Sequence, residues 1–226
     1  MFLPSILPPE QIIYHKEQHL ILRRSVIHDA EALIEAIQAS LPALHQFMPW
    51  SHFPNSNTVA SQRKRLNNLT LQWNDQKEYV YHIFLQQGDD EYFIGCIGLH
   101  PRCSSNRGLE VGYWIRSGMA GRGLCTLATK MVILMGFHVM DLHRIQVGCD
   151  DANIGSRCVI EKVGFGFEAL QRNMGFTKVP QHIVQNGWKG TGNTRTYALI
   201  PEDLSQLDWV ESISSNIRYE FAEDLS

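Results

Sequence analysis

Two neighbouring stretches decide the fold: LEVGYWI at residues 109–115 and AGRGLCT at residues 120–126. The first stretch is predicted as a strand over residues 109–116, and the second leads into an apolar segment with helical periodicity that ends at Met140. A period of about 3.6 residues is typical of a helix. The sequence therefore predicts a strand, a glycine-rich turn and a long buried helix in direct succession.

The turn between this strand and this helix has the composition of a phosphate-binding loop. Backbone N–H groups in the first turn of a helix have no partners within the helix, and together with the helix dipole they attract anions. Gly121 and Gly123 carry no side chain that would keep a bulky pyrophosphate away. Thr126 adds a hydroxyl, and Arg122 adds a positive charge. A plain glycine-rich turn without a ligand is the competing interpretation, because short motifs have low specificity.

The rest of the chain predicts a mixed α/β sheet. Further strands are expected at residues 19–24, 78–87, 92–100, 144–149, 165–172 and 194–200, and further helices after Asp29, Asn57 and Asp151. The first strands are antiparallel and a βαβ unit follows, so we expect about six or seven strands with helices on both faces. One domain over residues 18–203 is expected, with an N-terminal extension at 1–17 and a C-terminal extension at 204–226.

Composition excludes several classes of protein. The net charge is −3 and the pI is about 6.4, so the basic surplus of a dedicated nucleic-acid binder is absent. The five cysteines include no C-x-x-C pair, so we expect no metal site and reduced thiols in the cytoplasm. No apolar stretch approaches the roughly 20 residues that span a bilayer, so no membrane association is expected.

Other phosphate-binding motifs fit the loop less well. No Gly-Lys-Ser/Thr sequence occurs, so the P-loop of nucleotide-binding proteins is missing. A dinucleotide-binding fingerprint needs a third glycine, and the chain has Thr126 at that position. These two departures argue against a nucleotide- or dinucleotide-binding enzyme.

An ordered set of motifs around the loop resembles the GNAT superfamily of acetyltransferases, and within it the RimJ/RimL-like branch. The set comprises E-x-G-Y-W at 110–114, G-x-G-hydrophobic-x-T at 121–126, N-x-x-S at 153–156, E-K-x-G-F at 161–165 and Met-Pro-Trp at 48–50. The resemblance covers residues 18–203. The family signature usually has Gln or Arg where this chain has Ala120, and Gly or Ala where it has Cys125, so a side-chain contact from position 120 is lost.

The resemblance implies a cofactor site. Acetyl-CoA is expected between two strands that splay apart, here 112–116 and 144–149, with pantetheine paired to backbone near Trp114 and Ile115. The pyrophosphate is expected on the loop and the first helical turn, and Asn153 is expected to hydrogen-bond pantetheine. The loop residues concerned are Gly121, Arg122, Gly123, Leu124, Cys125 and Thr126.

The resemblance also implies two catalytic residues. Glu110, on the strand entering the splay, is the expected base, acting directly or through water, and Ser156 is the expected acid. Each has a structural alternative. For Glu110 the alternative has equal weight: a carboxylate at the edge of a strand, facing solvent. For Ser156 and Asn153 the alternative is an ordinary residue at the start of a helix.

Taken together, these patterns predict a cytoplasmic N-acetyltransferase that transfers the acetyl group of acetyl-CoA to a primary amine. The acceptor amine is expected at the N-terminus of a ribosomal or other protein. A small-molecule acceptor, such as a polyamine or an antibiotic, stays open as an alternative, as does a non-catalytic sensor of acyl-CoA. No metal and no direct nucleic-acid contact are expected, and a homodimer is compatible with this hypothesis.

Overall fold

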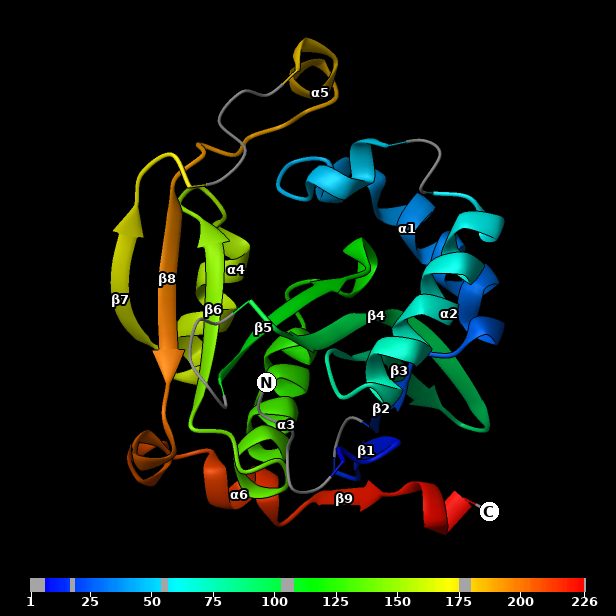
Figure 1. The fold of residues 1–226 in the computed structure, drawn as a ribbon, viewed down its shortest axis with the longest axis vertical. Helices are drawn as coiled ribbons and strands as arrows, with labels where there is room; N and C mark the ends of the chain where they lie inside the picture. The colour runs from blue at the N-terminus through cyan, green and yellow to red at the C-terminus, as the bar shows by residue number, and fades with distance from the viewer. Residues whose placement is uncertain (1–6, 17–18, 54–56, 103–107, 175–179, 226) are drawn as a thin grey trace.

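A computed structural model describes residues 7–16, 19–53, 57–102, 108–174 and 180–225. Nine strands form one sheet in the order β7-β8-β6-β5-β4-β3-β2-β1-β9 (Figure 1). The strands are β1 (Gln11–Tyr14), β2 (Leu20–Arg24), β3 (Tyr79–Gln87), β4 (Asp90–His100), β5 (Gly108–Ile115), β6 (Arg144–Asp150), β7 (Gly166–Gln171), β8 (Thr194–Leu199) and β9 (Ile217–Glu220).

The predicted mixed, mostly antiparallel sheet is confirmed, and it is larger than expected. All seven predicted strands are present, with ends that differ by one or two residues. The estimate of six or seven strands was too low, because β1 and β9 come from the two segments expected to be extensions. Both additional strands are only four residues long, too short to show periodicity, and β1 is held between β2 and β9.

One pair of strands separates along its length. All neighbouring strands are antiparallel except β5 and β6, which are parallel over only three residue pairs, the last being Glu110 with Gln146. Beyond that pair β5 continues along β4 as far as Ile115, and β6 continues along β8 as far as Asp150. The outer edges of both strands stay hydrogen-bonded while their inner edges diverge, which is the predicted splay (Figure 1).

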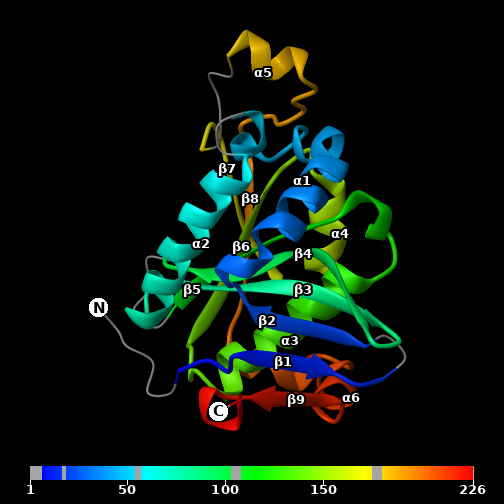
Figure 2. The same ribbon diagram turned by 90° about the vertical axis from the view of Figure 1, so that its right-hand side faces the viewer.

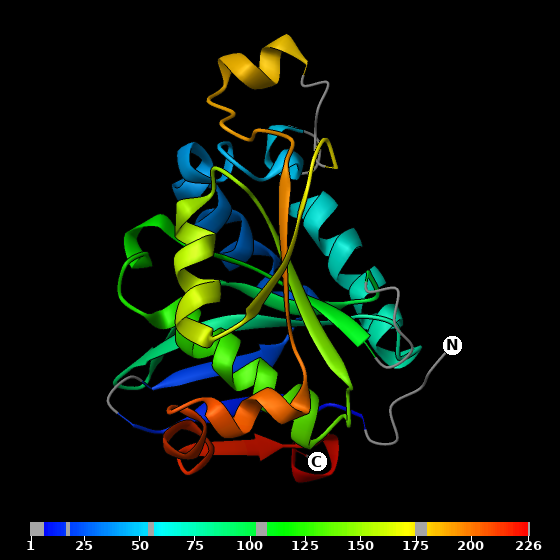
Figure 3. The same ribbon diagram turned by 90° about the vertical axis from the view of Figure 1, so that its left-hand side faces the viewer.

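Helices pack on both faces of the sheet, as Figures 2 and 3 show. One face carries α1 (Ala30–Leu44) and α2 (Val59–Asn74), and the other carries α3 (Leu124–His138) and α4 (Ile154–Val163). Two shorter helices, α5 (Gln181–Gln185) and α6 (Val210–Ser214), lie in the C-terminal third of the chain. The apolar side chains form two clusters, one on each face of the sheet.

The long helix α3 is the centre of the larger cluster. Most of its side chains from Leu124 to Phe137 are buried, because it lies against the sheet, α4 and α6. A helix that is apolar on nearly all sides belongs in a core. Because α3 is buried, its N-terminal end is held in place beside the splay between β5 and β6.

Candidate functional site

The divergence of β5 and β6 opens two adjoining cavities. The larger has a volume of about 540 Å³ and the smaller about 380 Å³. They adjoin each other, since six residues line both: Phe47, Met48, Tyr113, Trp114, Asn153 and Ser156. Together the two cavities extend from the N-terminal end of α3, beside the splay, to the face of the sheet covered by α1 and α2.

The smaller cavity ends at the glycine-rich loop. Gly121 and Gly123 have φ angles of +77° and +78°, and a Cβ atom on either would meet no protein atom within 4 Å. Gly123 is the N-cap of α3 and has no side chain to accept a hydrogen bond from the first turn. In α4, by contrast, Asn153 Oδ1 accepts a hydrogen bond from the Ser156 backbone N–H at 3.1 Å. The α3 end thus offers both space and backbone donors to an anion.

Most of the predicted cofactor residues come together around this smaller cavity. Those that line it are Trp114, Ile115, Gly121, Gly123, Leu124, Cys125, Thr126 and Asn153. Arg122 does not line it: the side chain is exposed, and its Nη1 atom lies 3.0 Å from the Met119 sulfur. Burial raises the pKa of the Cys125 thiol to about 12, so this side chain stays neutral beside the loop.

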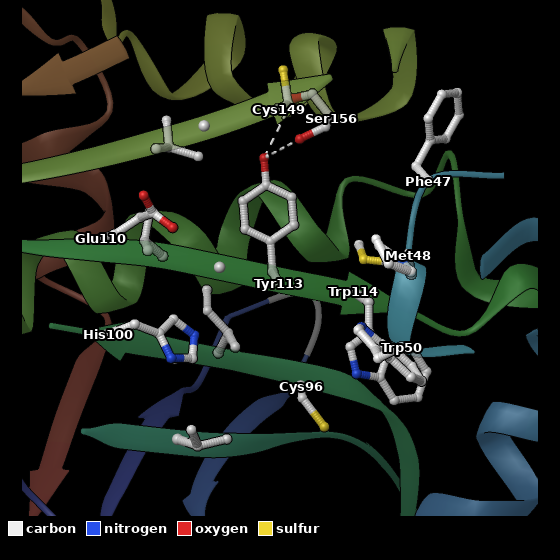
Figure 4. Close-up of a pocket in the computed structure, with 18 of the residues that line it drawn as sticks. Phe47, Met48, Trp50, Cys96, His100, Glu110, Tyr113, Trp114, Cys149 and Ser156 are labelled. Carbon is white, nitrogen blue, oxygen red and sulfur yellow. Dashed lines mark hydrogen bonds between the residues drawn. The ribbon is translucent and has the colours of Figure 1, made fainter. Parts of the chain in front are cut away.

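A hydrogen bond crosses the splay where the two cavities meet. The Tyr113 hydroxyl of β5 lies 3.1 Å from Oγ of Ser156 on α4, as Figure 4 shows. Burial raises the pKa of Tyr113 well above its usual range, so the phenol keeps its proton. Burial also raises the pKa of the neighbouring Cys149 to about 11. This junction is therefore an uncharged, hydrogen-bonded group of protonated side chains.

Glu110 lies on the wall of the larger cavity, at the point where β5 and β6 part. Its Oε2 accepts a hydrogen bond from Gln146 Nε2 at 3.1 Å, and its Oε1 lies 3.5 Å from Arg102 Nη1. The side chain is 21% exposed, which differs from a carboxylate standing free in solvent. Figure 4 shows it on the same side of the cavity as His100.

Two polar residues of this site were not assigned from the sequence. Tyr113 is inside the E-x-G-Y-W motif, but its partner Ser156 is 43 residues away in the chain. His100 lines the larger cavity, and its partner Glu78 is 22 residues away. The only sequence signal for either was a polar or amphipathic residue in a predicted strand, and that signal does not identify a partner.

Within the described residues, no group of three or more His, Cys, Asp or Glu side chains could hold a metal ion. In the same part of the chain, no helix has the length and apolar character needed to cross a membrane.

The diverging parallel strands and the glycine loop place a helix N-terminus suited to an anion beside a gap in the sheet. The model of the family described as "Acetyltransferase (GNAT) domain" matches residues 19–166, more than half of the chain. The chain therefore belongs to the GNAT acetyltransferase family, and the resemblance inferred from the motifs is confirmed.

Relatives of known description agree with this assignment. A Bacillus subtilis (strain 168) protein named "Probable N-acetyltransferase YjcK" is 33% identical over 116 residues, which cover 51% of this chain and 63% of that protein. The structure of Mycobacterium smegmatis RimJ in complex with CoA-disulfide has a TM-score of 0.75 at 20% identity, with 97% and 100% of the two chains covered.

A ribosomal L7/L12 α-N-protein acetyltransferase, RimL in complex with coenzyme A, has a TM-score of 0.70 at 19% identity. The matched region covers 84% of this chain and 97% of that structure.

Proposed function

We propose that the protein transfers the acetyl group of acetyl-CoA to the N-terminal α-amine of a protein or peptide. One observation carries the proposal: the cavity at the α3 N-terminus adjoins, through six shared lining residues, a second cavity with the Glu110 carboxylate at the point where β5 and β6 part. Acetyl transfer needs these two sites side by side, one for the cofactor and one for the amine.

The residues of the smaller cavity fit the cofactor. Gly121 and Gly123 leave space for a pyrophosphate, and the free backbone donors at the start of α3 would bind it. Trp114 and Ile115 lie on the inner edge of β5 beyond its last pair with β6, so their strand edge can pair with pantetheine. Acetyl-CoA, when bound, supplies an acetyl group activated as a thioester.

The surrounding side chains would carry the protons of the reaction. Glu110 is the proposed base, positioned to draw the ammonium form of the acceptor into the larger cavity and to start its deprotonation, directly or through water. Ser156 is the proposed proton donor to the leaving thiolate. The contact with Tyr113 extends this proposal, because a phenol that stays protonated can supply the proton through Ser156 or in its place.

The choice of acceptor is also a proposal. The RimL structure is described as an α-N-protein acetyltransferase of ribosomal L7/L12. The larger cavity of this chain is open enough, at about 540 Å³, for the first residues of a peptide, and aromatic side chains at Trp50 and Trp114 border it. These features favour a protein N-terminus over a small polyamine, and they support a ribosomal protein as one acceptor to test.

A matched set of acceptors tests the proposal. Hexapeptides that begin with Ser or Ala, the same peptides with a blocked N-terminus, and spermidine are incubated with acetyl-CoA, and release of the CoA thiol is measured. We expect release with the free peptides only. Release with spermidine alone would assign a small-molecule acceptor. CoA binding without release for any acceptor would indicate a non-catalytic acyl-CoA sensor.

A further inference from the structure

A row of polar residues crosses β6, β5 and β4 beside the larger cavity. Glu110 of β5 pairs with His100 of β4 on one side and with Gln146 of β6 on the other. Glu78, next to the first residue of β3, extends the row through its contact with His100. Directly opposed residues of neighbouring strands have Cβ atoms about 5 Å apart. His100 is therefore as close to the acceptor cavity as the proposed base, and it lines the same cavity.

The imidazole of His100 is held in one orientation. Its Nδ1 atom lies 2.5 Å from Oε1 of Glu78, and the side chain is only 14% exposed. The hydrogen bond with His100 holds the pKa of Glu78 below its usual range, although burial acts in the opposite direction. The carboxylate is thus ionised and can only accept, so Nδ1 must carry the proton. In the neutral ring, Nε2 is left as the proton acceptor.

Two glycines make room for this ring. Gly98 and Gly112 face each other across β4 and β5, and a Cβ atom on either would lie 3.1 Å from Nε2 of His100. Nε2 of His100 therefore lies over two positions without side chains on the cavity wall. One of them, Gly112, is two residues before Trp114 on β5. Gly112 is the glycine of the E-x-G-Y-W motif, so this position of the motif has a role of its own: it leaves room for the His100 ring.

We propose that His100, held in place by Glu78, receives the proton that the acceptor amine loses, so that it acts as a catalytic residue with Glu78 as its positioning residue. The proposal rests on the proposed function and adds the destination of the proton. The ammonium N–H bond breaks with Glu110 as the first acceptor, and the proton comes to rest on Nε2 of His100. The imidazolium is stabilised by the Glu78 carboxylate and returns the proton to solvent after the product leaves.

The chemistry of the side chains favours this route. An α-amine ordinarily has a pKa near 8, an imidazole near 6.5 and a carboxylate near 4, so an imidazole is the closer match for holding the proton. Four charged groups belong to this region: Glu78 is bonded to the ring, Glu110 is opposite His100 in the sheet, and Arg65 and Arg102 line the same cavity.

The test compares pH profiles of His100→Gln, Glu78→Gln and His138→Gln with the wild type, using acetyl-CoA and a hexapeptide that begins with Ser. We expect His100→Gln to lower kcat by about 100-fold or more at pH 7. Part of the activity should return between pH 7 and 9, because a growing fraction of the peptide amine is then already neutral when it binds and has no proton to pass to His100. Glu78→Gln should lower kcat by about tenfold and leave the peptide KM unchanged.

His138→Gln is the matched control, since this exposed histidine lies at the end of α3, outside both cavities. Its activity should equal that of the wild type. Circular dichroism checks that His100→Gln is folded, and the Kd for acetyl-CoA checks that it still binds the cofactor. A kcat of His100→Gln within threefold of the wild-type value, with the same pH profile, would overturn the role of His100 and leave the proposed function intact. No turnover by the wild type with any acceptor would remove the proposed function, and this proposal with it.

Discussion

At the scale of single residues, backbone conformation and burial decide what each side chain can do. Gly123 and Gly88 show this clearly, because both have positive φ angles, +78° and +64°, and both face open space. Only Gly123 lies beside the cavity at the start of α3; Gly88 is in the β3–β4 turn. The two positions therefore separate backbone strain from ligand contact.

We expect Gly123→Ala and Gly88→Ala to lower the free energy of unfolding by a similar amount, about 1 kcal/mol, because each places an L-residue in the left-handed region. Gly123→Ala alone should weaken CoA binding, by at least about tenfold, since its Cβ occupies the space proposed for the pyrophosphate. Calorimetric titration with CoA and urea unfolding measure the two effects. Equal CoA affinity in both variants would contradict the placement of the pyrophosphate.

A buried cluster of ionisable side chains joins β2 and β3 to the segment before α1. His82 is fully buried, its Nδ1 lies 2.6 Å from Asp29 Oδ2, and Arg23 lies 3.0 Å from Oδ1 of the same carboxylate. Burial by itself raises the pKa of Asp29, but His82 and Arg23 outweigh it and hold that pKa below its usual value. Burial lowers the pKa of His82, although Asp29 acts against it.

Both shifts predict that acid destabilises the fold. A lowered histidine pKa means that the unfolded chain binds the extra proton first, so stability falls as the pH drops below about 6.5. The Asp29 contribution is present above about pH 3.9, the usual aspartate value, and is lost as the pH falls through the lower folded value. We expect Asp29→Asn to lower the free energy of unfolding by about 3 kcal/mol at pH 7. This difference from the wild type should shrink below about pH 4.

Urea unfolding at pH 7 and at pH 3 measures the change. Asp75→Asn serves as the control, because this exposed carboxylate contacts only Lys77 among the ion pairs of the described residues. Exposed pairs contribute less than about 1 kcal/mol. An Asp29→Asn effect that does not depend on pH would show that the carboxylate stabilises through packing rather than charge.

At the scale of elements, the site is produced by the separation of β5 from β6 and by the contact that crosses the gap. The Tyr113–Ser156 contact ties β5 to the first turn of α4, on the far side of the splay. It holds two protonated hydroxyls where the smaller cavity meets the larger one. Tyr113 on β5 and Ser156 on α4 therefore meet at the boundary between the two cavities.

We expect Tyr113→Phe to lower kcat by about tenfold to 100-fold, because the leaving thiolate loses a hydrogen-bonded proton donor. Tyr79→Phe is the control: Tyr79 is 1% exposed, and its hydroxyl has no hydrogen-bond partner among the described residues. Ser156→Ala completes the set. Full kcat in Tyr113→Phe with a loss in Ser156→Ala would assign the proton to Ser156 alone.

At the scale of the whole molecule, the C-terminal segment takes part in the core rather than lying outside it. Trp209 is 7% exposed, its Nε1 donates a hydrogen bond to the Val163 carbonyl at the end of α4, and Lys130 of α3 lies over its ring. Further along, β9 pairs with β1, so both ends of the chain close the same edge of the sheet (Figure 2).

We expect Trp209→Ala to lower the free energy of unfolding by about 3–5 kcal/mol, the usual cost of removing a large buried aromatic side chain. Leu71→Ala, at a position 61% exposed on α2, should change it by less than about 0.5 kcal/mol. Urea unfolding measures both. A Trp209→Ala effect as small as the control would mean that residues after 203 contribute little to the core.

Local pattern accounts for much of the fold. The runs of apolar and aromatic residues in 78–87 and 92–100, the helical period after Leu124 and the glycine at the end of α4 predicted the type and order of these elements. These signals are reliable because side-chain periodicity and backbone conformation are properties of a few consecutive residues. β1 and β9 were missed for the same reason, since four residues carry too short a pattern.

The sequence by itself determined the family, the type and order of most elements, and the glycine loop, because each depends on neighbouring residues in a fixed order. The splay was expected only from the resemblance to the family. Only the tertiary structure decided which side chains share a cavity. It placed His100 on Glu78 and Tyr113 against Ser156, and it turned Arg122 away from the smaller cavity. Such contacts join residues on different strands and helices, and their geometry follows from sheet register and packing, which no local pattern encodes.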